Sequence, residues 1–511
     1  MITLSSPRRA TTTGLPSRSI VRQSWVLMCA SIALCAAAEG LVRIGDDAVA
    51  LWLVLSTVSL LLAPLYVRRE KSRFPDPVWL LAVLNVLYFP ARAAFLYFGR
   101  EYTTVALDAD LAFDSKAIEA LRLVTLAGCA TYWGILLPTP GKPRGRLANY
   151  WSSRATEGAV RAYLMMGFIS LPMRAIMSLT SSAKFAGPFS ALLGEMISAG
   201  LIATAAAVTF SREKTHQLAA LVLVTLSIIN IFSFGSKEPF LILMLFVLAG
   251  RSLRGRTIPY VSLAAAGLVA SFVVFPVIEG KRAKERFSLD SVADGIRMAS
   301  DARSGTNSGT ILDSLRFATA NVSERMHGME SLATILYRVP EIVPHEGLDS
   351  FASRLLWSFA PRAFFPEKPI VARGSFFNSK LVQMNTESIE TAPIAVFQIG
   401  EAYYIAGSSF VIVIAAWIGW YSRIISKLQA WFPYEGFFPY FCLLLWTLSA
   451  VERDIILVWT SLPRSLLVFT LLYGLCSTLL GKSNRHTGRF KIDSQNSAAP
   501  GQLHSATVGS N

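Results

Sequence analysis

The sequence predicts an all-α polytopic membrane protein with about twelve transmembrane helices and one large, partly helical loop on the outer side. Two observations favour this fold class. Of the 511 residues, 53% are hydrophobic and only 16% are charged, which is too apolar for an ordinary soluble protein. The apolar residues also come in blocks of roughly 20, the length of a helix that crosses a bilayer.

The apolar blocks define twelve expected spans. They cover residues 24–42, 48–67, 77–98, 118–137, 160–180, 189–210, 217–234, 238–250, 258–278, 403–421, 435–450 and 455–478. The eighth span is short and shares a hairpin with the seventh. The chain therefore divides into a cytoplasmic tail over 1–23, nine helices over 24–278, a large outer loop over 279–402, three helices over 403–480 and a tail over 481–511. The last tail lacks apolar periodicity, which predicts disorder.

The distribution of basic residues predicts the orientation of the chain. Connections assigned to the inside contain 23 Lys and Arg, whereas the short outside loops contain 6. Inside loops of membrane proteins are enriched in these residues, so both termini are expected in the cytoplasm. Much of the net charge of +15 then serves topology rather than nucleic-acid binding. The five cysteines all fall in apolar segments, so we expect core hydrophobes rather than a disulfide framework or a metal site.

Several charged residues lie inside expected spans, in the half nearest the outside. They are Glu39, Arg92, Arg122, Arg174, Glu195 and Arg464. A charge at the middle of a bilayer costs about 2.5–3.5 kcal/mol, so each needs an explanation. One interpretation is that the side chains reach toward the outer interface. The other is a polar cavity open to the outside, in which Arg92, Arg174 and Arg464 face an anionic ligand.

Within the large loop, residues 310–338 have the periodicity of a helix. Arg325 shares a face with apolar residues at spacings of three and four, so it requires an anion or a carboxylate partner. Glu324, His327 and Glu330 recur every third residue on an adjacent face. These three residues are candidates for a general base or a weak metal set, although a solvated helix face is the commonest explanation of such a pattern.

A proline-rich stretch follows at 361–369. Pro361, Pro366 and Pro369 exclude a helix across Arg362 and Lys368 and stiffen the segment. Rigidly held cations are suited to binding a phosphate group. The alternative is an ordinary interfacial loop whose phenylalanines dip into the lipid headgroups.

Three motifs in this region occur in a fixed order. They are Arg325 to Glu330, then Pro361-Arg362 with Pro366-Glu367-Lys368-Pro369, then Gly400-Glu401-x-Tyr403 with Gly407. This order resembles the Wzy-type O-antigen polymerases, the oligosaccharide repeat-unit polymerases. The similarity covers about 310–410. Two departures are Phe365, where that family often has Trp, and Ile405-Ala406, where it often has Asn-Phe.

The resemblance implies a metal-independent glycosyltransferase of the bacterial inner membrane, without a cofactor and compatible with a GT-C-like fold. Its donor and acceptor would be glycans on undecaprenyl pyrophosphate at the periplasmic face, and a flippase and a chain-length regulator are expected partners. The implied pyrophosphate ligands are Arg325, Arg362, Lys368, Arg92, Arg174 and Arg464. The implied candidates for the base are Glu401, Glu330 and His327, with Glu401 ranked first because it ends the loop at the membrane.

Two other functions fit the same residues. An O-antigen ligase uses the same donor with a lipid A acceptor. A transporter would distribute polar residues through both halves of the membrane, whereas here they are biased outward. The paired acids Asp46-Asp47 and Asp108-Ala109-Asp110 are interpreted as solvated loop residues, with metal binding as the alternative.

The asymmetry of basic residues makes a direct prediction about topology. A reporter that is active only in the periplasm should be active when fused after Gly309 and silent when fused after Lys482. Measurement of the reporter in whole cells tests both fusions, and the reverse pattern would contradict the orientation.

Overall fold

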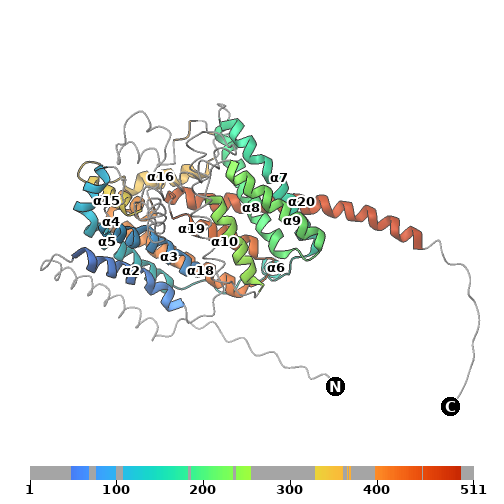
Figure 1. Cartoon of the computed structure of the whole chain (residues 1–511), viewed down its shortest axis with the longest axis horizontal. Helices are drawn as coiled ribbons and strands as arrows, with labels where there is room; N and C mark the ends of the chain where they lie inside the picture. Colours follow the sequence, from blue (N-terminus) through green and yellow to red (C-terminus); the bar gives the residue numbers. More distant parts are fainter. Residues whose placement is uncertain are drawn as a thin grey trace, which may run out of the picture.

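The computed structural model describes residues 48–67, 76–98, 107–181, 186–233, 238–254, 328–360, 365, 367–369, 397–451 and 453–495. All the regular elements within these ranges are helices (Figure 1). Six of them are long and apolar enough to cross a membrane. The expected class, a helical membrane protein, is therefore confirmed.

The six candidate spans coincide with six of the expected ones. They are α2 (Ala48–Val67), the run from α3 (Pro77–Val86) through the π-turn η1 (Leu87–Ala91) to α4 (Arg92–Phe98), α8 (Ala186–Phe210), α9 (Lys214–Ser233), α18 (Gln398–Trp431) and α20 (Ile455–Gln495). Four further expected spans fall on α5 (Leu107–Leu136), α7 (Glu157–Ser181), α10 (Glu238–Leu253) and α19 (Phe438–Ser449). The expected spans 24–42 and 258–278 lie outside the described residues. Helix α20 continues beyond the expected end at 478, so the first part of the predicted tail is helical.

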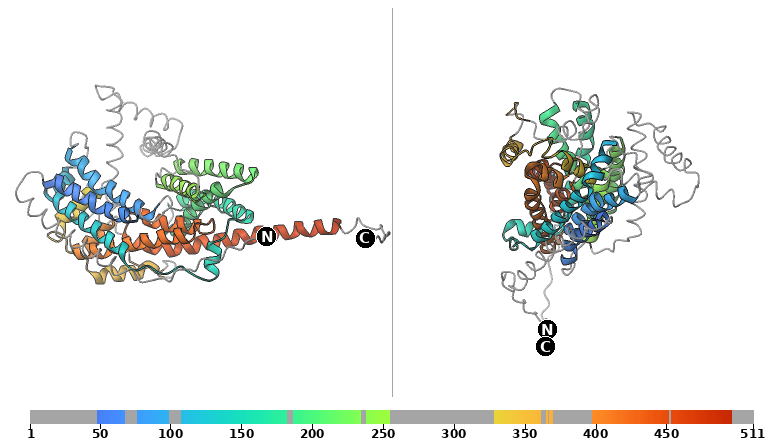
Figure 2. Two further views of the ribbon diagram at one scale, coloured as in Figure 1. Left: turned by 90° about the horizontal axis from the view of Figure 1, so that it is seen from below. Right: turned by 90° about the vertical axis from the view of Figure 1, so that its left-hand side faces the viewer.

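The helices form two adjoining groups. Helices α2, α3, α5 and α18 pack together, and α7, α8, α9 and α10 form the second group (Figure 1). Helices α19 and α20 contact both groups, and α20 projects past the bundle toward the C-terminus (Figure 2). Small residues permit the closest approach between α5 and α18. A Cβ atom at Gly134 or Gly419 would collide with the backbone of the other helix, as is typical of helix packing in membranes.

Two sets of connecting segments lie at opposite ends of the bundle. At one end, α15 (Gly328–Arg338) and α16 (Leu348–Phe359) lie near the start of α18. At the other end, α6 (Arg146–Trp151) and the segment after it contact the connection between α18 and α19 (Figure 1). We refer to these as the outer end and the inner end. The alternation of connections and the side of the membrane that each end faces stay predictions.

A π-turn interrupts the helix that runs from Pro77 to Phe98. It contains Pro90, which has no N–H to donate to the helical ladder. A π-turn inserts an extra residue and rotates the side chains that follow, and such turns are frequent at functional sites. The first residue after it is Arg92, whose side chain points into the protein and is 1% exposed.

Helix α18 has a sharp kink at Ala406 and Gly407. Gly407 has φ +70° and ψ −163°, a region that is essentially restricted to glycine. The kink divides α18 into a short first part, which carries Glu401, and a long second part that runs to Trp431. The change of direction between the two parts of α18 therefore depends on Gly407.

Substitution of Gly407 by Ala should destabilise the protein by about 1–3 kcal/mol, because Ala must adopt an unfavourable backbone conformation. Gly474 in α20 is a matched control, since a Cβ there meets no atom within 4 Å and has no unusual φ. The Gly474→Ala protein should unfold at the same temperature as the wild type or slightly above it. Thermal unfolding in detergent measures both, and equal midpoints for the two variants would contradict the role of the kink.

Candidate functional site

The kink of α18 presents two backbone carbonyls to the large loop. The carbonyls of Tyr404 and Ile405 accept hydrogen bonds from the N–H groups of Glu346 and Gly347, each at 3.0 Å. Nδ1 of His345 lies 3.3 Å from the same Tyr404 oxygen. Because the helical ladder is interrupted here, these oxygens can bind a second segment. The segment before α16 is thereby attached to the start of α18.

This attachment places a buried ion pair beside α18. Arg354 of α16 donates from Nε to Oε1 of Glu346 at 2.6 Å and from Nη2 to Oε2 at 2.5 Å. The Ser350 hydroxyl donates to the same carboxylate at 2.8 Å. The two charged side chains are only 7% and 3% exposed. A two-pronged contact between guanidinium and carboxylate is geometrically specific, so it fixes the orientation of Arg354.

Glu401 also lies close to Arg354. Its Oε1 is 3.5 Å from Nη2 of Arg354, and its side chain is fully buried. Its Oε2 accepts a hydrogen bond from the N–H of Ile455, the first residue of α20, at 2.5 Å. The first N–H groups of a helix have no partner within the helix and carry a partial positive charge. Glu401 therefore caps α20 and joins the starts of α18 and α20.

Asp454 completes this group. It precedes Ile455, is 8% exposed, and its negative charge acts on Glu401. We call Glu346, Arg354, Glu401 and Asp454 the buried acidic network. It contains three carboxyl groups and one guanidinium, in a place where an unbalanced charge is costly.

A polar cavity adjoins the network at the outer end. Its empty volume is about 650 Å³, and it lies between α8, α19 and α20. The lining residues are Gly194, Glu195, Ser198, Leu443, Trp446, Thr447, Arg453, Ser461 and Ser465. The Ser465 hydroxyl donates to the Glu195 carboxylate. The positive charges of Arg453 and Arg464 act on Glu195 as well. We refer to this as the outer cavity.

The connection between α19 and α20 links the network to the outer cavity. Arg453 lines the cavity, and the next residue, Asp454, belongs to the network. The start of α18 holds this connection, because Gln398 donates from its backbone N to Val451 O at 3.3 Å and from Nε2 to Ala450 O at 3.1 Å. Arg453 is therefore positioned by contacts that begin at α18.

Two of the predicted site residues contact each other. Nε of Arg92 donates to Oε1 of Glu330 at 2.7 Å, and Nη2 contacts the same oxygen. Their side chains are 1% and 6% exposed, and they join the π-turn of the first group of helices to α15. The predicted pyrophosphate ligand and the predicted base are thus partners in a buried ion pair.

The other predicted residues have different positions. Lys368 donates from Nζ to Ala360 O at 2.8 Å and to Ser358 O at 3.4 Å, so it caps the C-terminal end of α16. Arg464 is exposed on α20. The backbone of Arg174 belongs to α7, and its side chain is outside the described part. His327, Arg325 and Arg362 also lie outside the described residues.

Sequence reasoning missed most of the network. Arg354 and Glu346 belong to no motif, and Arg453 was counted only as a basic residue of a short loop. The one signal available in the sequence was Gly407, which ends the third of the three motifs and permits the kink in α18. Glu195 was recognised as a charge in the outer half of a span, without a partner.

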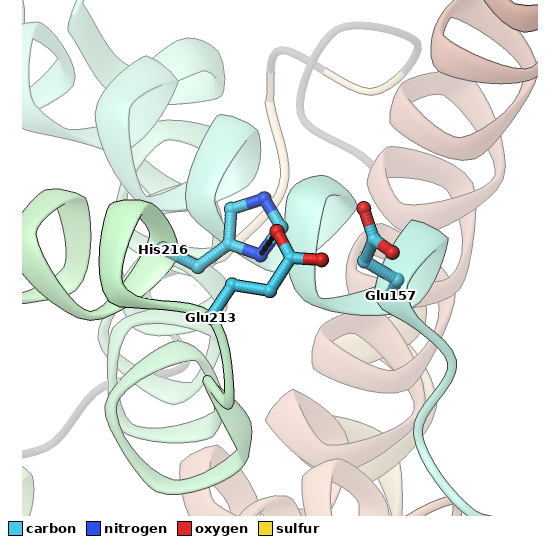
Figure 3. Close-up of side chains that lie close together, drawn as sticks. All are labelled: Glu157, Glu213 and His216. Carbon is cyan, nitrogen blue, oxygen red and sulfur yellow. Dashed lines mark ion pairs between the residues drawn. The ribbon is translucent and has the colours of Figure 1, made fainter.

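The described residues also include one group with the composition of a metal site. Ligand atoms of Glu157, Glu213 and His216 lie within 4.8 Å of one another at the inner end (Figure 3). The Glu213 carboxylate is 3.4 Å from Nδ1 of His216, and both carboxylates are about half exposed. Glu157 already forms an ion pair with Arg161. The group is remote from the outer cavity, and metal independence stays a prediction.

Removal of Arg92 alone should be strongly destabilising. Arg92→Met leaves the Glu330 carboxylate buried without its partner, which costs about 3–5 kcal/mol. The double variant Arg92→Met/Glu330→Met removes both charges and should recover most of this loss. Unfolding by SDS titration in mixed micelles measures the free energies.

The half-exposed pair Lys116–Glu119 is the control, with an N–O distance of 2.8 Å. Replacing Lys116 and Glu119 by Met should lower the free energy of unfolding by only about 0–1 kcal/mol. The prediction would be contradicted if the double variant lost as much free energy of unfolding as the two single variants together. Arg92 and Glu330 would then not be coupled.

The geometry thus combines a buried charge network with a polar cavity in the outer half of a helical membrane protein. Comparison of the chain with protein-family models, with curated proteins and with solved structures found no match. The case for a function therefore depends on the site itself and on the resemblance described above.

Proposed function

We propose that this protein polymerises oligosaccharide repeat units carried on a lipid pyrophosphate, at the outer face of the bacterial inner membrane. The supporting observation is the outer cavity, which combines a carboxylate, an arginine and hydroxyl groups at the end of the bundle where the lipid headgroups are expected. A lipid-linked sugar presents its phosphates and its reactive carbon at the depth of the lipid headgroups. The substrate and the cavity therefore match in position and in chemistry.

The lining of the outer cavity suits both parts of such a donor. Arg453 and Arg464 supply guanidinium groups near Glu195, and guanidinium binds phosphate oxygens in pairs. Ser198, Ser461 and Ser465 offer hydroxyl groups for hydrogen bonds with a sugar. Trp446 adds an apolar face, against which a sugar ring can pack. Arg325 and Arg362 keep the role of further phosphate ligands that the resemblance implies.

The reaction is a substitution at the anomeric carbon of the donor. A hydroxyl oxygen of the acceptor forms a bond to that carbon, while the bond from the carbon to the pyrophosphate oxygen breaks and its electron pair leaves with the pyrophosphate. We assign Glu195 as the base that takes the hydroxyl proton, because its carboxylate lines the cavity. The arginines stabilise the charge that develops on the leaving group.

In this proposal, the fully buried carboxylates have a positioning role. Glu330 is paired with Arg92, and Glu401 caps α20 and contacts Arg354. A general base must reach the proton that it removes, which favours Glu195 over these two. Glu401 and Asp454 instead hold the connection that carries Arg453.

Glu195→Gln and Arg453→Lys should each block chain extension while the protein stays in the membrane. Loss of one group that acts in the transition state typically lowers the rate by about 10²–10³. Cells that depend on either variant should accumulate single lipid-linked repeats, visible on a gel of lipid-linked and surface glycan beside an immunoblot of the protein.

Matched controls are Glu157→Gln and Arg161→Lys at the inner end, which should give normal glycan ladders. Normal ladders from both cavity variants would refute the assignment of the outer cavity. Long lipid-linked chains that fail to reach their final acceptor would instead identify a ligase. If Glu401→Gln stops extension at an unchanged protein level while Glu195→Gln does not, Glu401 is the base.

A further inference from the structure

A second polar cleft lies at the inner end, away from the outer cavity. Its empty volume is about 990 Å³, and four chain segments enclose it. The lining residues are Arg154, Arg212, Leu253, Arg254, Pro433, Tyr434 and Glu435. They come from the connection before α7, the connection before α9, the end of α10 and the connection after α18. We refer to this as the inner cleft.

Hydrogen bonds hold the walls of the inner cleft together. The Glu435 carboxylate accepts from the N–H of Ala155 at 2.7 Å and contacts Nη2 of Arg212 at 3.3 Å. The backbone N–H of Gly436 donates to Ser153 O at 2.9 Å. A Cβ at residue 436 would collide with the Tyr150 carbonyl, so the two connections are in close contact. The cleft is therefore a built feature between segments that are distant in the sequence.

The charges around the inner cleft are unbalanced. The described lining contains three arginines and one carboxylate, a formal excess of two positive charges. Glu435 is shared between Arg212 and the Ala155 amide. The Arg254 guanidinium lies over the Phe210 ring, with its central carbon 5.6 Å from the centroid, so an apolar surface helps to position it.

The rest of the lining indicates which anion fits. Leu253, Pro433 and Tyr434 form an apolar rim, and the Tyr434 side chain is 43% exposed. Tyrosine is enriched where a membrane protein crosses from hydrocarbon to headgroups. Basic pockets at the ends of transmembrane helices, on the cytoplasmic side, bind the headgroups of anionic lipids. The combination of arginines and apolar rim suits a phosphate with acyl chains attached.

We propose that the inner cleft binds the phosphate of an anionic glycerophospholipid from the leaflet at that end of the bundle. Arg154, Arg212 and Arg254 bind the phosphate oxygens, and the apolar rim contacts the glycerol and the first acyl carbons. This lipid is separate from any glycan substrate at the outer end, and its binding does not depend on the proposed polymerase activity. Bound lipid would also join the connections of α7, α9 and α10 to the end of α18.

The test uses the purified full-length protein in a neutral detergent. Thermal unfolding is followed while phosphatidylglycerol, or phosphatidylcholine with the same acyl chains, is added as mixed micelles. Phosphatidylglycerol should raise the unfolding midpoint in a saturable manner, and phosphatidylcholine should not. Arg154→Gln combined with Arg212→Gln should raise the half-saturating concentration of phosphatidylglycerol about thirty-fold, because each basic residue near an anionic lipid contributes about 1 kcal/mol.

Both positions are exposed, so the single variants keep the test usable if the double variant is unstable. Arg161→Gln is the control, since it removes the same charge at the same end but lies outside the cleft. Retained binding in Arg161→Gln with weaker binding in the cleft variants supports the proposal. Equal binding by wild type and cleft variants would overturn it. Full protection by glycerol 1-phosphate at the same concentration would overturn the assignment to a lipid and identify a soluble phosphate.

Discussion

Two carbonyl groups at the kink of α18 control the arrangement of the outer end. Tyr404 and Ile405 bind the backbone of Glu346 and Gly347, and this contact brings α16 and Arg354 beside Glu401. Glu401 then caps α20, and the cap sets the connection that carries Arg453 into the outer cavity. The chain of contacts begins at Gly407, because only glycine readily adopts its backbone angles. One backbone feature therefore positions side chains that are more than a hundred residues apart in the sequence.

Charged residues are buried at the outer end in spite of their cost. Arg92 with Glu330 and Arg354 with Glu346 are each nearly inaccessible to solvent. Buried pairs of this kind contribute little net stability, because desolvation offsets the attraction, but loss of one partner is expensive. The first pair joins the residue after the π-turn to α15, and the second joins α16 to the preceding segment, whose backbone is bound to the kink. Their value therefore lies in specifying which segments meet, and this specificity is what a site assembled from loops requires.

The two ends of the bundle differ in their polar chemistry. The outer cavity combines a carboxylate with an arginine and hydroxyls, which suits a reaction in which a proton and a phosphate group both move. The inner cleft has an excess of guanidinium groups and an apolar rim, which suits the stable binding of an anion. Helices α8 and α10 and the α18–α19 pair extend between these ends. In the two proposals, the protein works on a lipid carrier at the outer end and binds a different lipid at the inner end.

The sequence by itself determined the class of this protein and most of its helices. Spans such as 48–67 were predictable because a bilayer requires apolar runs of about 20 residues, a local property that composition records. Only the tertiary structure decided which polar residues meet. Arg92 and Glu330 are 238 residues apart, and Glu401 and Ile455 are 54 apart. No local rule joins such pairs, because their contact depends on a π-turn, a kink and the packing of small residues between helices, and these act together only in the folded chain.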